Sequence, residues 1–456
     1  MFKGPLKTVA YAMFGVFLWV PSGHGEVLGL DVAVRAALAD NPSLEVVAAR
    51  AQAMAEIPTQ AGALPDPALT LGAMNLPSDS FATGREPMTQ LQVGIRQKLP
   101  FPGKRRLKNT TAQHAADAAL ADLEEAHLTL VRDVVITWWH LFYMDQAIEI
   151  VGRNQDLLRQ FVSIARTRYR VGKGLQQDVL LAEVELSKLL DRALELEGMR
   201  TATAAQLNAL LGRPGKNPIT LPREADEELP DVASDDVLFA RALTHRPMLS
   251  AATSRGYSAV SALELAGKEH LPDFMVSATY GFRDGENMDG SERADFASLM
   301  LSVDLPLYKA DRQDRQVAQR THELAEQSAA LRQATDRLQA DLIGLRAKYM
   351  ASRERVRLFR AGIIPQASQT VSSMLAGYQV NKVDFLNLVR SQITLYNYET
   401  LYWKGLSEAK GDRARLIAAA GGGVDPEEAM TSAPKSAAPP LPSDKTTPMR
   451  SEAHTP

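Results

Sequence analysis

The chain has 456 residues, in which 51 Lys and Arg are nearly balanced by 54 Asp and Glu, and its formal net charge is −3. A chain without a basic excess lacks the charge that neutralises a nucleic-acid backbone, so no nucleic acid partner is expected. The sequence contains no cysteine, which excludes a disulfide framework and a lipid-modified N-terminal cysteine. Any membrane attachment must then come from the fold.

Residues 1–25 are typical of a secretory signal peptide. Lys3 and Lys7 precede an apolar run over residues 9–20, and small residues follow up to Gly25. This run is too short to span a bilayer of roughly 30 Å, so cleavage after Gly25 is expected, with an uncleaved anchor as the alternative. The rest of the sequence has no run of ~18 apolar residues, which leaves an exported chain two options: a soluble periplasmic protein or a β-barrel.

Four landmarks of the sequence recur in the same order at nearly constant spacing. They are Asn41-Pro42 with Arg246-Pro247, Leu64-Pro65-Asp66 with Leu271-Pro272-Asp273, Leu99-Pro100 with Leu305-Pro306, and the Tyr-x-Val-x-Lys segments at 169–173 and 378–382. This internal repetition indicates two related halves, which we place at residues 28–225 and 233–420. Residues 226–232 then form an acidic linker, and residues 421–456 are predicted to be disordered because they hold almost no large apolar side chains.

Each half is predicted to contain a helix, a strand hairpin and two long helices. In the first half, a helix from Asp31 continues past Pro42 to about Gly62, strands follow at about 68–75 and 90–98, and long helices occupy about 104–170 and 176–211. In the second half, a helix at about 235–267 precedes strands at about 274–282 and 297–305 and long helices at about 311–378 and 383–420. Alternation with period two indicates the strands. The helices far exceed the ~11-residue mean of globular proteins.

The predicted strands match the roughly 9 to 11 residues with which a tilted strand crosses an outer membrane. Four strands cannot close a barrel, and an open edge in lipid leaves backbone groups unpaired, so other copies of the chain are expected to complete the sheet. The alternative is a soluble sandwich whose polar face meets water. In a barrel, the polar side chains would line the lumen: Gln90, Gln92, Arg96, Ser277, Thr279, Ser298, Ser302 and Asp304.

Over about residues 28–420, the sequence resembles the TolC-type outer-membrane efflux proteins. The resemblance is carried by Pro65-Asp66-Pro67, by the junction at residues 99–105 and by the close of the first half at residues 207–212. It implies a mainly α fold with a membrane β-barrel portion, made of two tandem structural repeats and assembled as a homotrimer with a twelve-stranded barrel and an α-helical tunnel. It also implies an outer-membrane location extending into the periplasm, contact with outer-membrane lipid, and docking through a periplasmic adaptor on an inner-membrane pump of the RND class. No cofactor is implied.

Members of this family close their periplasmic end with two aspartates one helical turn apart, and residues 383–387 resemble that segment. Asp384 matches the first aspartate, whereas Asn387 departs from the second, which halves the charge of a three-fold ring and leaves cation selectivity open. We therefore assign Lys382, Asp384 and Asn387 to the periplasmic aperture. The alternative is that Asp384 only caps the following helix. The related turn of the first half contains Tyr169, Lys173 and Asp178.

The junction at residues 99–105 resembles the branch of the family that serves heavy-metal exporters. The function implied is a duct of a tripartite efflux system for small solutes, with heavy-metal cations among the candidates. No histidine pair stands at a ligand spacing and a lone methionine is more often a core residue, so no metal site is predicted. The basic run at residues 104–108 would meet lipid phosphates or form a solvated face, since positive charge does not favour a helix start.

The sequence has no phosphate loop, nucleophile elbow or His-Glu-x-x-His motif, so no catalysis is expected. One alternative keeps the duct but assigns it to a type I protein secretion system. Another is a periplasmic coiled-coil adaptor, which would share the helical hairpin but carry it only once.

Overall fold

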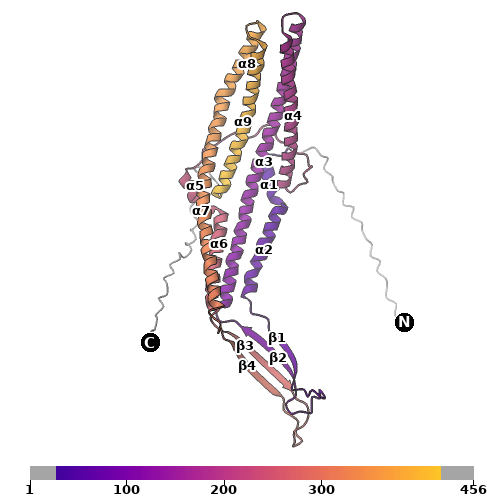
Figure 1. Ribbon diagram of the computed structural model, residues 1–456, viewed down its shortest axis with the longest axis vertical. Coiled ribbons are helices and arrows are strands. Elements are labelled where there is room, and N and C mark those ends of the chain that lie inside the picture. The colour runs from indigo at the N-terminus through magenta and orange to yellow at the C-terminus, as the bar shows by residue number, and fades with distance from the viewer. Residues whose placement is uncertain (1–26, 423–456) are drawn as a thin grey trace, which may run out of the picture.

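The computed structural model describes residues 27–422 as a long helical rod with a small sheet at one end (Figure 1). The helices of the first half are α1 (Leu30–Ala39), α2 (Pro42–Gly62), α3 (Lys104–Arg170) and α4 (Gln176–Leu210). Those of the second half are α5 (Asp235–His245), α6 (Pro247–Lys268), α7 (Gln313–Leu358), a π-helical turn η1 (Phe359–Ile363), α8 (Ile364–Gln379) and α9 (Phe385–Ala420). The strands are β1 (Ala68–Met74), β2 (Gln90–Leu99), β3 (Asp273–Phe282) and β4 (Phe296–Asp304).

The predicted signal peptide and residues 423–456 of the predicted tail lie outside the described residues. Among the helices of residues 27–422, none has both the length and the apolar character needed to cross a membrane.

The first predicted helix is broken into two, because α1 ends at Ala39 and α2 begins at Pro42. Proline has no backbone N–H, so it suits the first turn of a helix and not its interior. Asn41 caps the new start: its Oδ1 accepts the backbone N–H of Ser43 at 3.0 Å, and its Nδ2 donates to the carbonyl of Leu210 at 2.7 Å. The same break separates α5 from α6 at Pro247.

The long helix predicted at 311–378 also differs from expectation, because η1 interrupts it. Pro365 lies two residues after η1, in the first turn of α8, and cannot donate a hydrogen bond to the carbonyl of Ala361. A π-helical turn widens the backbone at such a point and lets the helix continue. In the first half, α3 runs without interruption from Lys104 to Arg170.

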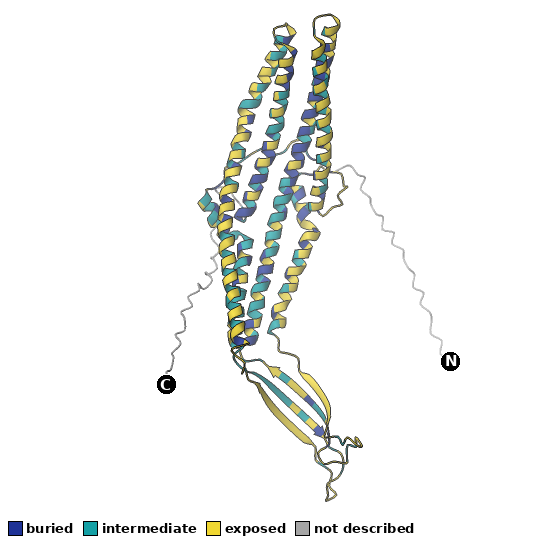
Figure 2. Cartoon of the chain, in the orientation of Figure 1, coloured by how far each residue is buried: buried dark blue, intermediate teal, exposed yellow. Residues whose placement is uncertain are grey.

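The core lies where α1, α3, α4 and α9 meet (Figure 2). Trp138 and Phe142 stack at a centroid distance of 5.4 Å, and Trp139 meets Trp138 edge-on at 5.2 Å. The Trp138 Nε1 donates to the carbonyl of Leu28 at 2.9 Å, which satisfies the one polar atom of this buried ring. The buried aromatic rings of α3 therefore hold the segment around Leu28, just before α1, against the middle of α3.

The acidic segment between the halves lies against the second half. Asp231 forms an ion pair with Arg353, and the Tyr349 hydroxyl donates to the carbonyl of Pro230 at 2.5 Å. Asp226 pairs with Lys410 at 3.4 Å. The backbone N–H of Glu228 and the Lys410 ammonium lower the pKa of Asp226 from its usual value, although partial burial opposes this. The segment predicted as a linker is thus fastened to α7 and α9 by its own acidic side chains.

The four strands form one antiparallel sheet in the order β1-β2-β3-β4. Each half contributes one hairpin, and β2 pairs with β3 across the halves, with Val93 opposite Tyr280. Because β1 and β4 each have one neighbour, both edges of the sheet remain open within the described chain. This end of the rod is distant from the tips of the helical hairpins (Figure 1).

Candidate functional site

The register of the sheet places the predicted lumen residues on a single face. Arg96 lies opposite Ser277, and Thr279 lies opposite Ser298. Directly opposed residues of an antiparallel pair share a face, and side chains alternate along each strand. These two rules assign every other strand residue to one face or the other. The face contains Gln90, Gln92, Arg96, Ser277, Thr279, Ser298, Ser302 and Asp304, together with Met74, Met275 and Met300. Gly281 leaves room for the Gln90 side chain, which a Cβ there would overlap.

Apart from the amide of Gln97 on β2, the opposite face is apolar in all four strands, and it is largely exposed. Leu299 is 81% exposed and Leu71 is 73% exposed, and Figure 2 shows β1 and β4 coloured as exposed along their length. The face is made of Leu69, Leu71, Leu91, Val93, Ile95, Phe274, Val276, Ala278, Tyr280, Leu299, Leu301 and Val303. A contiguous apolar surface of this kind marks contact with a membrane or with another protein.

The start of α3 joins the sheet to the helices through a buried cation. Lys104 is only 3% exposed, and its Nζ donates to Glu269 at 3.1 Å, to the Leu271 carbonyl at 2.9 Å and to Asp273 at 2.9 Å. Arg105 donates to the carbonyl of Gly62 at 2.8 Å. For Lys104, neither lipid contact nor a solvated face is correct, because its charge is buried and paired within the chain. Arg105 is partly exposed. Arg106 and Lys108 are exposed.

At the tip of the second hairpin, Asp384 caps α9. Its Oδ1 accepts the backbone N–H of Asn387 at 2.8 Å, and its Oδ2 accepts from the Asn387 side chain at 3.0 Å. The preceding turn is tight, with Asn381 in the left-handed region at φ 59° and the Lys382 N–H bonded to the Gly377 carbonyl at 2.9 Å. The capping alternative is thus realised, while the aperture role of Lys382, Asp384 and Asn387 stays a prediction.

The tip of the first hairpin has the same construction. The Lys173 N–H donates to the Arg168 carbonyl at 2.8 Å, and Gly172 has φ 71°. Tyr169 is exposed beside this turn, and Asp178 lies in the first turn of α4.

Arg168 connects the two tips, a role that sequence reasoning missed. Its guanidinium lies 4.5 Å from the centroid of the Tyr378 ring, donates to the Tyr378 carbonyl at 3.3 Å and contacts the Asn381 side chain. The aligned Tyr-x-Val-x-Lys segments put Arg168 at the position of Gly377, and this difference between the two copies is the sequence signal that could have revealed its role. Within residues 27–422, no three His, Asp or Glu side chains gather as a metal site requires.

Comparison with known proteins agrees with this geometry. Residues 33–213 match the model of the outer membrane efflux protein family. Protein CyaE of Bordetella pertussis is 26% identical over 264 residues, which are 53% of this chain and 54% of that protein, so the match spans about half of the relative's length. The outer membrane protein VceC of Vibrio cholerae has a TM-score of 0.73 at 20% identity, covering 86% of this chain and 96% of its own. The open state of the MtrE outer membrane channel of Neisseria gonorrhoeae gives 0.73 at 16% identity, covering 87% and 90%.

The fold is therefore the one found in solved outer-membrane channels. Residues 33–213 match the outer membrane efflux protein family by sequence, so the predicted resemblance to TolC-type outer-membrane efflux proteins is confirmed over that segment. The likeness in fold to solved outer-membrane channels extends through the second half. The predicted location in the outer membrane, reaching into the periplasm, is confirmed with it. The expectation of a mostly helical chain with a small sheet is confirmed as well.

Proposed function

We propose that the protein is one subunit of a trimeric duct that carries small solutes through the outer membrane and periplasm. The observation that carries this proposal is the four-stranded sheet, which has one exposed apolar face and two open edges. In lipid, every unpaired backbone group costs several kcal/mol, so the edges of β1 and β4 must pair with strands of other copies. Three copies supply twelve strands. A barrel of about eight strands would be filled by its own side chains and leave no lumen.

The polar face then lines the lumen and the apolar face meets lipid. Gln92, Arg96 and Asp304 carry polar or charged groups that need water, and their parity keeps them all on one side of the wall. The shared element order of the two halves supports two tandem repeats at 28–225 and 233–420, whose helical hairpins would together wall a tunnel of twelve helices in a trimer. Lys382, Asp384 and Asn387 would surround its periplasmic aperture, with Tyr169, Lys173 and Asp178 in the related turn of the first repeat.

The partners in this proposal are a periplasmic adaptor and an inner-membrane pump of the RND class, which would select the cargo before it enters the duct. Heavy-metal cations are one candidate cargo, and a type I secreted protein is the alternative. Growth of a deletion strain on copper and silver salts, set beside the protein content of its medium, distinguishes the two: metal sensitivity supports solute efflux, and loss of one secreted protein supports the alternative.

The trimer itself is tested by membrane fractionation followed by electrophoresis of unheated and heated samples. We expect the protein in the outer-membrane fraction, migrating as a trimer before heating and as a monomer afterwards. A monomer recovered from the periplasmic extract would contradict the proposal.

A further inference from the structure

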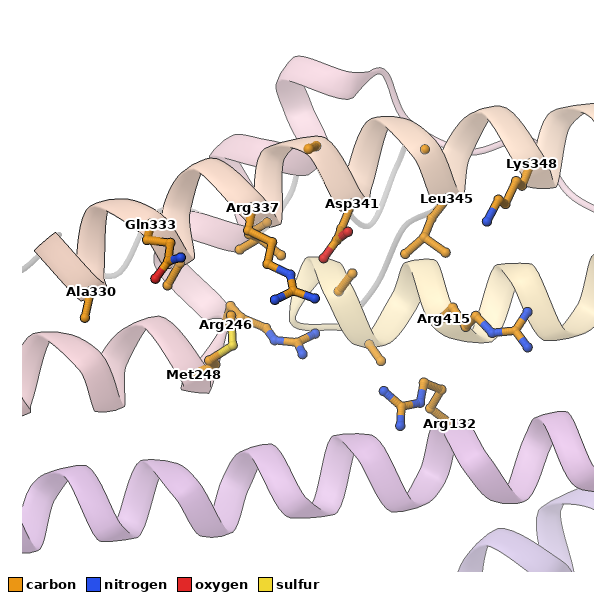
Figure 3. Close-up of a pocket in the computed structure, with 16 residues that line it drawn as sticks. Arg132, Arg246, Met248, Ala330, Gln333, Arg337, Asp341, Leu345, Lys348 and Arg415 are labelled. Atoms are coloured by element: carbon orange, nitrogen blue, oxygen red, sulfur yellow. The ribbon is translucent and has the colours of Figure 1, made fainter.

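A cavity of about 640 Å³ opens between α3, α7, α9 and the junction of α5 with α6 (Figure 3). Its charged lining consists of five cations and one carboxylate: Arg132, Arg246, Arg337, Lys348, Arg415 and Asp341. Small residues of the lining, including Ala334 and Gly344, leave the space between the charged groups open. The volume is that of a site for a small molecule.

Three of the guanidinium groups converge on the same part of this cavity. Figure 3 shows Arg132, Arg246 and Arg337 reaching toward one another from α3, the α5–α6 junction and α7. Arg246 is 10% exposed, and it uses one nitrogen in an ion pair with Glu125. Its Nε and Nη1 are buried and have no hydrogen-bond partner in the described part of the chain.

Of the other two guanidinium groups, only Arg132 has an ion-pair partner in the described chain, and Asp341 is the one carboxylate of the lining. Arg132 pairs with its neighbour Asp133 at 2.8 Å, and Arg337 forms no ion pair within residues 27–422. Buried donors without partners are rare in proteins and call for an unseen acceptor. Planar guanidinium forks that converge from separate helices match the geometry of carboxylate and phosphate groups.

We propose that this cavity binds a small multivalent oxyanion that bears carboxylate or phosphate groups. The anion accepts hydrogen bonds from the free nitrogens of Arg246 and from Arg337, and its charge relieves the repulsion among the three guanidinium groups. All of these residues belong to one chain, so the site does not depend on the proposed duct or on its cargo.

The test is calorimetric titration of the full-length protein in a neutral detergent, with inorganic phosphate and citrate as separate probes at constant ionic strength. We expect saturable binding of at least one probe at one site per chain, and the tighter probe identifies the preferred oxyanion. Arg337→Gln should weaken that binding at least tenfold. Arg337 is exposed and unpaired within the described chain, so its removal leaves the fold intact.

Arg332→Gln is the matched control, because Arg332 is an exposed cation of the same helix that does not line the cavity. It should bind the probe as the unaltered protein does. The proposal is overturned if neither anion saturates, if Arg337→Gln binds unchanged, or if both variants weaken binding equally, since equal losses indicate general charge screening.

Discussion

Asp384 combines a structural and an electrostatic property in one side chain. Its carboxylate holds both the backbone and the side-chain nitrogen of Asn387, so the first turn of α9 depends on it. Its negative charge is the property that the aperture assignment uses. Asparagine caps a helix about as well as aspartate but carries no charge, which allows the two properties to be separated.

We expect Asp384→Asn to keep the start of α9 intact and Asp384→Ala to destabilise it by about 1 kcal/mol, the usual value of an N-cap. Hydrogen exchange of the amides at 386–388 measures this difference. If the charge also acts at the aperture, both variants should reduce cation selectivity in bilayer recordings under a salt gradient. Unchanged recordings for both would leave only the capping role.

Lys104 gives a second prediction at the scale of single residues. Replacing it by methionine keeps the length of the side chain but leaves Glu269 without its cation, and Asp273 keeps only the more distant Lys98 at 3.6 Å. Breaking a buried ion pair from one side costs about 3–5 kcal/mol, so Lys104→Met should lower the temperature at which the oligomer dissociates on unheated gels. Lys108→Met, which alters an exposed lysine one turn later, is the control. Equal melting of the two variants would contradict the structural role.

At the scale of elements, regular patterns were predictable from sequence and local exceptions were not. Parity assigns each strand residue to a face whatever the register, and for this reason the polar face of the sheet could be predicted without knowing the pairing. The break before Pro42 was missed because the alanine-rich pattern continues through it, and the decisive contact, from Asn41 to Leu210, is distant in sequence.

Contacts between residues that are distant in sequence also explain why parts of the candidate sites were missed. Arg168 acts on Tyr378, and Arg246 acts beside Arg132, so neither pairing is visible in a local window. Lys104 was assigned to lipid or solvent because its acidic partners come from the second half of the chain. The roles assigned to the lumen and aperture residues stay predictions.

The two helical hairpins give a prediction of their own. Arg168→Ala removes the contacts with Tyr378 and Asn381 that hold the tips together. The tips should then separate more often, and single-channel conductance in planar bilayers should rise or show longer open periods. Arg170→Ala is the control, because Arg170 is a neighbouring arginine with no contact to the second hairpin among its hydrogen bonds in the described chain. If Arg170→Ala had the same effect, loss of charge at the tip would explain it.

At the scale of the whole molecule, adjacent residues of β4 distinguish the two sides of the proposed barrel wall. Leu299 belongs to the apolar face and Ser298 to the polar face. An arginine facing lipid near the midplane costs roughly 2–4 kcal/mol, whereas a lumen position tolerates charge. Leu299→Arg should therefore reduce the amount of oligomer in the outer membrane, and Ser298→Arg should assemble normally, as judged from unheated gels. Equal assembly of both variants would contradict the proposed orientation of the sheet.

The pairing of β2 with β3 also constrains the order in which the protein matures. Val93 meets Tyr280, so the middle of the sheet cannot form until the second hairpin has been synthesised and exported. Contacts between such distant segments form slowly, and incomplete sheets are prone to aggregate. During that delay, β2 has only β1 beside it, and the leucines of this first hairpin remain in water with an open strand edge next to them. The newly exported first hairpin is therefore the part of the chain most exposed to wrong strand pairing.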